Sequence, residues 1–206
     1  MEIINKYFQN LTERQSSQIK ALGELYADWN SKINLISRKD IENLYEKHIL
    51  HSLAIAKILR FTDKTSILDI GTGGGFPGIP LAIIFPAVRF LLIDSIGKKI
   101  NAAEDIAKQI GLENVECVQE RAEDEKRQFD FVVTRAVMPL PDLVKAAKKN
   151  IAHDQHNALP NGFICLKGGV LQAEIQPFHN NVIVYELSDY FEEEFFKTKK
   201  AVYLPV

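Results

Sequence analysis

The organisation of the chain centres on residues 67–78, Ile67-Leu68-Asp69-Ile70-Gly71-Thr72-Gly73-Gly74-Gly75-Phe76-Pro77-Gly78. An apolar run, a glycine-rich turn and a second apolar run up to residue 85 predict a strand, a tight loop and a helix. Glycine suits such a loop because side chains would keep the backbone away from a ligand, and free N–H groups at a helix start favour polar or anionic groups. The stretch therefore predicts a nucleotide-binding loop.

One ligand pattern in this loop is the dinucleotide fingerprint. Gly73, Gly75 and Gly78 have its spacing, and Asp94 lies about the expected 20 residues downstream, where a carboxylate accepts ribose hydroxyls. A nicotinamide-dependent oxidoreductase is therefore one open alternative.

The same loop also fits a second pattern. Gly71, Gly73 and Gly75 form the alternate-glycine loop of S-adenosylmethionine methyltransferases, in which an acidic residue, here Asp69, closes the preceding strand. A carboxylate suits the cationic aminoacyl end of S-adenosylmethionine, whereas a pyrophosphate gains nothing from a nearby anion. Asp69 therefore favours S-adenosylmethionine as the cofactor.

The bulk composition is that of an ordinary globular protein. With 206 residues and a net charge of −2, no overall field draws the chain onto nucleic acid, so a polyanionic partner needs a local patch. Cys117 and Cys165 lie in separate apolar runs. This placement predicts two buried free thiols in a protein of a reducing compartment. Without a signal peptide or an apolar run near the roughly 20 residues of a membrane helix, we expect a cytoplasmic protein with no membrane partner.

Residues 1–64 predict a helical region packed on the main domain, which we expect to span residues 65–206. Thr12 and Gln15 have the spacing of a capping box at the start of a helix. An apolar stripe follows at Ile19, Leu22, Tyr26, Trp29 and Ile33. A second helix is predicted from near Ser37, with one face formed by Ile41, Leu44, His48, Ser52, Ile55 and Leu59.

Beyond the loop, short strand-like apolar runs alternate with segments that have the apolar spacing of a helix. This alternation predicts an α/β fold with a mostly parallel sheet covered on both faces. The predicted strands are 89–94, 115–119, 129–134 and 162–167, and the predicted helices are 96–110 and 140–151. The end differs, because residues 182–187 and 202–206 are apolar runs with no credible long helix between them. They predict a terminal hairpin with an antiparallel strand.

Ligands of an open parallel sheet sit beyond the carboxyl ends of its strands, so the polar residues there are site candidates. Asp94 either accepts ribose hydroxyls or caps the following helix. Arg135 directs a cation into the crevice between cofactor and substrate, where it suits an RNA phosphate or guanine. Its alternative is a structural ion pair with Glu123 or Asp94.

The other chemistry-bearing residues narrow the reaction. His48 is a candidate substrate contact, although a histidine on a packing face is usually only hydrogen-bonded there. No His, Cys, Asp or Glu cluster has metal-ligand spacing. Cys165 lies within an apolar strand, where a thiolate is not stabilised, so cytosine-C5 chemistry is disfavoured.

The segment 134–139, Thr-Arg-Ala-Val-Met-Pro, lacks the Asn/Asp-Pro-Pro-aromatic motif of enzymes that methylate an exocyclic amine. Without that motif, a nucleophilic thiol or a visible base, a methyltransferase needs a substrate that is already nucleophilic. Guanine N7 qualifies, because it carries a lone pair and loses no proton on methylation. Catalysis then reduces to desolvation and in-line positioning.

These motifs resemble the glucose-inhibited division protein B family, bacterial enzymes that methylate guanine N7 in small-subunit ribosomal RNA. The resemblance rests on pieces across the chain: Trp29-Asn30, Asn34-Leu35, His48 with Ser52-Leu53, residues 69–82, Asp94-Ser95, Lys98-Lys99, Arg121-Ala122-Glu123, Thr134-Arg135-Ala136 and Leu166-Lys167-Gly168. It implies a class I S-adenosylmethionine-dependent methyltransferase, Rossmann-like, acting on 16S ribosomal RNA. Carried over by position, the family's cofactor contacts fall on Gly71, Phe76, Ala122, Glu123 and Arg135.

The chain departs from the family at His51, where an aspartate usually precedes the serine. That carboxylate is either structural and replaceable, or His51 supplies a different contact to RNA. The family also implies a substrate presented on the 30S particle, and we expect a monomer. A small-molecule methyltransferase and a non-catalytic ribosome-assembly protein stay open as alternatives.

Overall fold

The computed structural model describes residues 1–37 and 40–206 and contains one seven-stranded sheet, in the order β3-β2-β1-β4-β5-β7-β6. The strands are β1 Ser66–Ile70, β2 Arg89–Asp94, β3 Val115–Gln119, β4 Phe131–Arg135, β5 Gly162–Gly168, β6 Ile183–Glu186 and β7 Lys199–Pro205. The first five strands pair in parallel, β7 runs antiparallel to β5, and β6 runs antiparallel to β7. This confirms the predicted mostly parallel sheet and its terminal hairpin.

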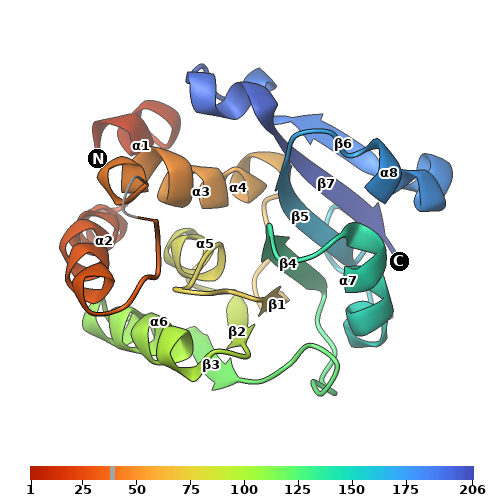
Figure 1. Cartoon of the computed structure of the whole chain (residues 1–206), viewed down its shortest axis with the longest axis horizontal. Helices are drawn as coiled ribbons and strands as arrows, with labels where there is room; N and C mark the ends of the chain where they lie inside the picture. The colour runs from red at the N-terminus through yellow and green to blue at the C-terminus, as the bar shows by residue number, and fades with distance from the viewer. Residues whose placement is uncertain (38–39) are drawn as a thin grey trace.

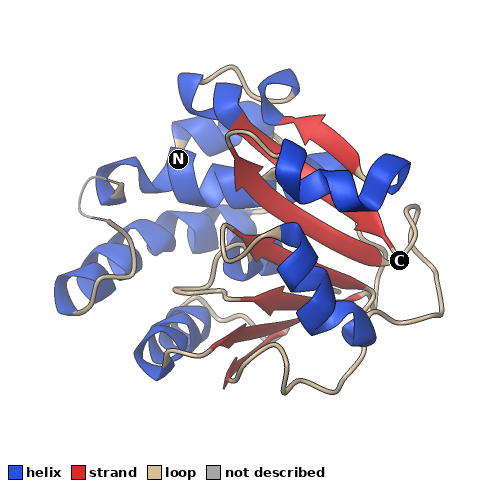
Figure 2. Cartoon of the chain, turned by 45° about the vertical axis from the view of Figure 1, so that its right-hand side comes forward, coloured by secondary structure: helices blue, strands red, loops and turns tan. Residues whose placement is uncertain are grey.

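Helices cover both faces of the sheet (Figures 1 and 2). Successive side chains of a strand point to opposite faces, so Ile67 and Phe131 pack under the helices of the N-terminal half, while Leu68 and Val132 pack against the other side. The first face carries α1 Glu2–Tyr7, α2 Glu13–Lys32, α3 His51–Leu53, α4 Ile55–Ile58, α5 Gly78–Ile84 and α6 Gly97–Gln109. The second face carries α7 Leu140–Ala147 and α8 Gln172–Ile175.

The first long helix forms as predicted. Thr12 caps α2, accepting a hydrogen bond from the Gln15 backbone while the Gln15 side chain accepts one from the Thr12 backbone. The apolar stripe of α2 is buried at Ile19, Leu22 and Tyr26. The same hydrophobic core includes residues of β1, β2 and β5, so the helical region and the sheet share one core.

The prediction of one regular second helix is wrong. It consists of a 3-10 turn at Ile41–Asn43, a π-helical segment at Tyr45–Leu50, α3 and α4. Residues 49–55 are all buried, because this part of the segment packs against α1 and α5. The residues just after Ser37, where this helix was predicted to start, lie outside the described part of the chain.

Smaller boundaries also differ. The strand predicted from residue 129 begins at Phe131, and Phe129 forms an isolated bridge to Ile151. The helix predicted over 140–151 ends at Ala147 and continues as a 3-10 turn at Lys148–Asn150. Among the described residues, no helix combines the length and the apolar character needed to cross a membrane.

Candidate functional site

The glycine-rich loop joins the carboxyl end of β1 to α5. Gly71, Gly73 and Gly75 have φ values of +66°, +58° and +101°, the left-handed region that other residues rarely adopt. A Cβ on Gly75 would lie 2.3 Å from the Ile79 side chain, so packing explains that glycine. A Cβ on Gly73 would meet no atom of the described residues within 4 Å. Gly73 therefore leaves open space beside the loop, as a cradle for a ligand requires.

Asp69 holds the two ends of this loop together. Its fully buried carboxylate accepts hydrogen bonds through Oδ2 from the Thr72 hydroxyl at 2.7 Å and from the Gly78 N–H at 2.8 Å. Oδ1 is buried without a hydrogen-bond partner among the described residues. Burial raises the pKa of Asp69 to about 7, against the lowering effect of its two hydrogen bonds. An unpartnered carboxylate oxygen at the loop fits a ligand that carries a cationic group.

Because of this raised pKa, we expect the unliganded protein to lose stability as the pH rises from 5 to 8. The unfolded carboxyl titrates near 3.8 and the folded one near 7, so between these values the folded state binds the extra proton. The stability is fully present below the unfolded pKa and is lost as the pH passes through 7. Each pH unit between pH 5 and the folded pKa near 7 costs about 1.4 kcal/mol of stability, so the loss is on the order of 3 kcal/mol.

Urea unfolding of the wild type and of Asp69→Asn at pH 5 and pH 8 measures this loss. Asp69→Asn has no proton to lose and should show a flatter dependence on pH. An identical pH dependence in both proteins would contradict the titration of Asp69.

Asp94 organises the loop from the next strand. Its Oδ2 accepts a hydrogen bond from the Gly73 N–H at 2.9 Å and its Oδ1 accepts one from the Ile96 N–H at 2.9 Å. It does not cap α6, whose N-cap position is Ile96. A carboxylate oxygen can accept two hydrogen bonds, so each oxygen of Asp94 retains the capacity to accept one from a ribose hydroxyl.

We expect Asp94→Asn to weaken cofactor binding about 10- to 150-fold, roughly 1.5–3 kcal/mol. The amide nitrogen of asparagine would face the N–H of Gly73 or Ile96, a donor opposite a donor. Calorimetric titration measures the affinity, with Asp28→Asn on the exposed surface of α2 as the control. An unchanged affinity would mean that Asp94 shapes only the turn into α6.

A cavity of about 430 Å³ opens beside the loop at the carboxyl ends of β1 to β4. It brings together five of the predicted site residues, Gly71, Asp94, Ala122, Glu123 and Arg135. Gly73 and Gly75 lie in the adjoining loop and Asp69 lies in β1, and none of the three lines the cavity. A side chain at residue 71 would collide with Val137, which packs over Gly71 from the segment after β4. The position of Val137 had no signal in the sequence.

Behind the loop, Arg135 and His48 form one cluster on the ring of Phe76. The Arg135 guanidinium lies 4.9 Å from the Phe76 ring centroid, and Nη1 donates to the Lys47 carbonyl at 3.2 Å. Its Nη2 lies 2.9 Å from His48 Nδ1. The alternative of an ion pair with Glu123 or Asp94 is wrong, since no carboxylate of the described residues lies within ion-pair distance of Arg135.

Arginine has no acceptor, so His48 Nδ1 accepts this hydrogen bond and the ring proton sits on Nε2. Burial, followed by the charge of Arg135, lowers the pKa of His48 to about 3. His48 is therefore neutral at physiological pH and does not serve as a proton acceptor through Nδ1. Burial also lowers the pKa of Arg135, to about 10, which leaves it charged.

Tyr26 is a residue whose role sequence analysis missed. Its ring stacks on Phe76 with centroids 4.6 Å apart, and its hydroxyl donates to the Gly74 carbonyl at 2.7 Å. It thereby ties α2 to the glycine loop. The available signal was a tyrosine inside an otherwise apolar stripe, because a buried hydroxyl needs a partner.

His51 packs against the segment that joins β6 to β7. It is 6% exposed and packs edge-on against Phe195 and Phe196. Its burial excludes the alternative in which His51 contacts RNA directly. Lys167, at the end of β5, is also buried, and its ammonium pairs with the Glu174 carboxylate at 2.8 Å.

Neither thiol is poised as a nucleophile. Cys165 is buried in β5 and Cys117 is half-buried in β3. Burial raises the pKa of each to about 12. Both thiols therefore stay protonated at neutral pH, in agreement with the expectation that covalent cytosine-C5 chemistry is disfavoured.

Comparison with known proteins shows the family to which this chain is similar. The chain matches the GidB family, described as rRNA small subunit methyltransferase G, over residues 15–202. A ribosomal RNA small subunit methyltransferase G from Phocaeicola vulgatus is 63% identical over 100% of this chain and 99% of its own length. One from Bacteroides thetaiotaomicron is 62% identical over 98% of each chain. A crystal structure of a SAM dependent methyltransferase from Aquifex aeolicus shares the fold, with a TM-score of 0.55 and 18% identity over 82% of this chain and 98% of that one.

These matches confirm the predicted class of fold and enzyme and contradict the alternative of a nicotinamide-dependent oxidoreductase. The loop agrees with them, since the unpartnered Asp69 oxygen and the open space at Gly73 suit S-adenosylmethionine. With the family match spanning residues 15–202 and the relatives matching nearly the whole chain, this chain belongs to the GidB family of small-subunit rRNA methyltransferases.

Proposed function

We propose that this protein transfers a methyl group from S-adenosylmethionine to N7 of a guanine in small-subunit ribosomal RNA. We propose further that it acts as a monomer on the 30S particle. The observation that carries the choice of N7 is the state of the groups around the site. His48 is held neutral with Nδ1 occupied, and both thiols are protonated. Guanine N7 requires neither a base nor a covalent nucleophile.

In this proposal the bound cofactor supplies an electrophilic methyl group on a sulfonium. Asp69, Asp94 and the backbone of the glycine loop hold the cofactor in one orientation. Arg135 provides a fixed positive charge at the end of β4, where substrate and cofactor meet. Arg135 is half-buried and has no carboxylate partner within residues 1–37 and 40–206, so it favours an anion, and a phosphate of the RNA or the carboxylate of the cofactor suits this position.

The 30S particle is the proposed substrate because the molecule has no overall positive charge. At a net charge of −2, the chain gains little from the phosphate backbone of naked RNA. On an assembled particle, the surrounding structure presents the target guanine and supplies further contacts.

Methyl transfer from labelled cofactor to 30S particles, naked ribosomal RNA and a metabolite mixture, run in parallel, tests the proposal. We expect label on the 30S particle, and chain cleavage by aniline after reduction should locate it as 7-methylguanine. Label only in the metabolites would establish the small-molecule alternative. An absence of transfer even in a single turnover would support the assembly role.

A further inference from the structure

The segment that joins β4 to α7 forms one wall of the cavity of about 430 Å³ beside the glycine loop. Val137 and Met138 both line that cavity. The Val137 side chain lies over Gly71, where an added Cβ would lie 2.5 Å from it. Val137 is itself 39% exposed, so packing holds it on only part of its surface. The position of this wall therefore depends on the contacts that the backbone of the segment makes.

The backbone of this segment is strained at its start. Ala136 has a φ of +52°, in the left-handed region that residues other than glycine rarely adopt. Such a conformation persists where surrounding contacts fix it, and it is common at sites that clamp a ligand. One of these contacts is the hydrogen bond from the Ala136 N–H to the Leu166 carbonyl of β5, at 3.2 Å. The next residue of β5, Lys167, supplies another.

Lys167 and Glu174 hold the far end of the segment. The Lys167 ammonium donates to the Met138 carbonyl at 2.5 Å and to Glu174 Oε2 at 2.8 Å. The same Oε2 accepts a hydrogen bond from the Leu140 N–H at 2.9 Å. Pro139, at the N-cap position of α7, has no side-chain oxygen for that N–H, so Glu174 caps α7 from α8. The ion pair therefore fixes the residues on both sides of Pro139.

This ion pair is largely shielded from water. The Lys167 side chain is 8% exposed and that of Glu174 is 27% exposed. Burial acts to raise the pKa of the Glu174 carboxyl, but the hydrogen bonds from Lys167 and from the Leu140 N–H outweigh it and lower the pKa from its usual value. Glu174 is therefore charged at neutral pH. Removal of either member leaves partly buried groups without their partners, so the strained segment would shift.

We propose that Lys167 and Glu174 are positioning residues for the cofactor. Through the backbone of residues 138–140 they hold Val137 and Met138 against bound S-adenosylmethionine. Neither Lys167 nor Glu174 lines the cavity, so neither touches the cofactor itself. Taking the cavity of about 430 Å³ as the cofactor site is part of the proposed function, and the positioning role depends on it.

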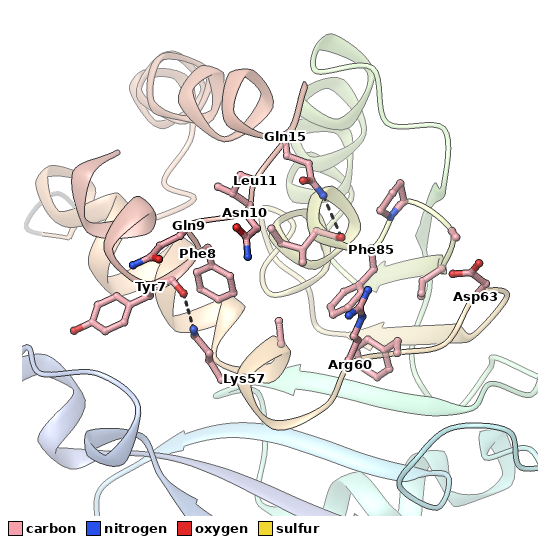
Figure 3. A pocket seen from close by; sticks show the side chains of 16 residues that line it. Tyr7, Phe8, Gln9, Asn10, Leu11, Gln15, Lys57, Arg60, Asp63 and Phe85 are labelled. Atoms are coloured by element: carbon pink, nitrogen blue, oxygen red, sulfur yellow. Dashed lines mark hydrogen bonds between the residues drawn. The ribbon is translucent and has the colours of Figure 1, made fainter. Parts of the chain in front are cut away.

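Calorimetric titration of S-adenosylmethionine into Lys167→Met and Glu174→Gln tests this role. Lys57→Met is the matched control, because the Lys57 ammonium also donates to a backbone carbonyl, that of Tyr7, at 2.5 Å. Figure 3 shows Lys57 in a separate cavity of about 730 Å³, which borders the amino ends of β1 and β2 and shares no residue with the cofactor cavity. Urea unfolding establishes that each variant is folded at the temperature of the titration.

We expect Lys167→Met and Glu174→Gln each to bind S-adenosylmethionine about tenfold more weakly, with Lys57→Met within about threefold of the wild type. Both losses have the same direction although the two substitutions remove opposite charges. An effect of charge alone would weaken binding in one variant and strengthen it in the other. Changes in opposite directions, or affinities close to that of Lys57→Met in both variants, would overturn the proposal.

A double-mutant cycle tests whether the pair acts through the cavity wall. Val137→Ala/Met138→Ala truncates the wall but keeps the Met138 carbonyl, so in this background Lys167→Met has less to displace. We expect its cost in affinity to shrink from about tenfold to about threefold or less. A full tenfold loss in the truncated background would overturn positioning through Val137 and Met138.

Gly73→Val separates a failure of the positioning role from a failure of the cofactor site. Lost binding in Gly73→Val with unchanged binding in both pair variants would leave the site standing and remove the positioning role. Unchanged binding in all three would remove the loop from the binding site, and the positioning role with it. These titrations need no RNA, so a failure of methyl transfer leaves them interpretable.

Kinetics on 30S particles, which presuppose the proposed reaction, distinguish positioning of the cofactor from positioning of the RNA. Lys167→Met should raise KM for S-adenosylmethionine about tenfold, while kcat at saturating cofactor stays within about threefold of the wild type. A lower kcat with an unchanged KM for S-adenosylmethionine would place the pair with the RNA and overturn its role toward the cofactor.

Discussion

Gly73→Val is expected to abolish binding of S-adenosylmethionine while the protein stays folded. Gly73 has a φ of +58° and the space beyond its missing Cβ is open, so a valine side chain would project into the cradle. The same residue donates its N–H to Asp94, so a shifted backbone would also disturb that carboxylate. We expect a loss of more than about 100-fold in affinity, equivalent to about 2.7 kcal/mol.

The chain offers a matched control at Gly111, in the turn between α6 and β3. Gly111 has a φ of +67°, and no atom in the described part of the chain lies within 4 Å of an added Cβ. Both substitutions place a branched residue in the left-handed region, with a strain on the order of 1–3 kcal/mol. Thermal unfolding should therefore show similar losses for both variants, whereas calorimetry should show lost cofactor binding only for Gly73→Val. Equal cofactor affinities in the two variants would remove the loop from the binding site.

The elements that sequence predicts well are those whose signal is local. The β1-loop-α5 unit, the capping box at Thr12 and the alternation of strands and helices each depend on neighbouring residues, and the structure contains all of them. The terminal hairpin was also predictable, because two apolar runs without a helix between them leave few other arrangements. Local patterns thus determine the layers of this fold.

The contacts that complete the site are not local. Arg135 reaches a carbonyl 88 positions earlier in the chain, and the Tyr26 hydroxyl reaches one 48 positions later. The break-up of the predicted second helix into 3-10, π-helical and α-helical pieces likewise has no sign in the spacing of its apolar residues. Ala136, with a φ of +52°, adopts its conformation in a segment without glycine, so its sequence holds no sign of it.

Arg135→Ala is expected to reduce formation of 7-methylguanine by more than 100-fold, beyond what a change in stability explains. The substitution removes a fixed cation from the end of β4 and leaves the Lys47 carbonyl and His48 Nδ1 without their donor. Each of the two acceptors left without its donor costs about 1–3 kcal/mol of stability. Rates are therefore measured well below the unfolding temperature of the variant, which circular dichroism provides.

Arg135→Lys separates charge from geometry. Lysine keeps the positive charge, but its single ammonium does not reproduce the fork that reaches Lys47 and His48 together. If the charge alone matters, this variant should recover most of the activity that alanine loses. If the fork matters, His48 is no longer fixed with its proton on Nε2, and the variant should stay close to alanine.

Cofactor affinity of the same variants shows which anion Arg135 holds. An arginine that grips RNA leaves the affinity for S-adenosylmethionine intact and raises KM for the particle. An arginine that grips the carboxylate of the cofactor weakens that affinity by about tenfold or more, the cost of a charged hydrogen bond. Wild-type levels of 7-methylguanine in Arg135→Ala would remove Arg135 from the site. A methyl group on any other atom would remove the N7 mechanism, because the need for a base would return.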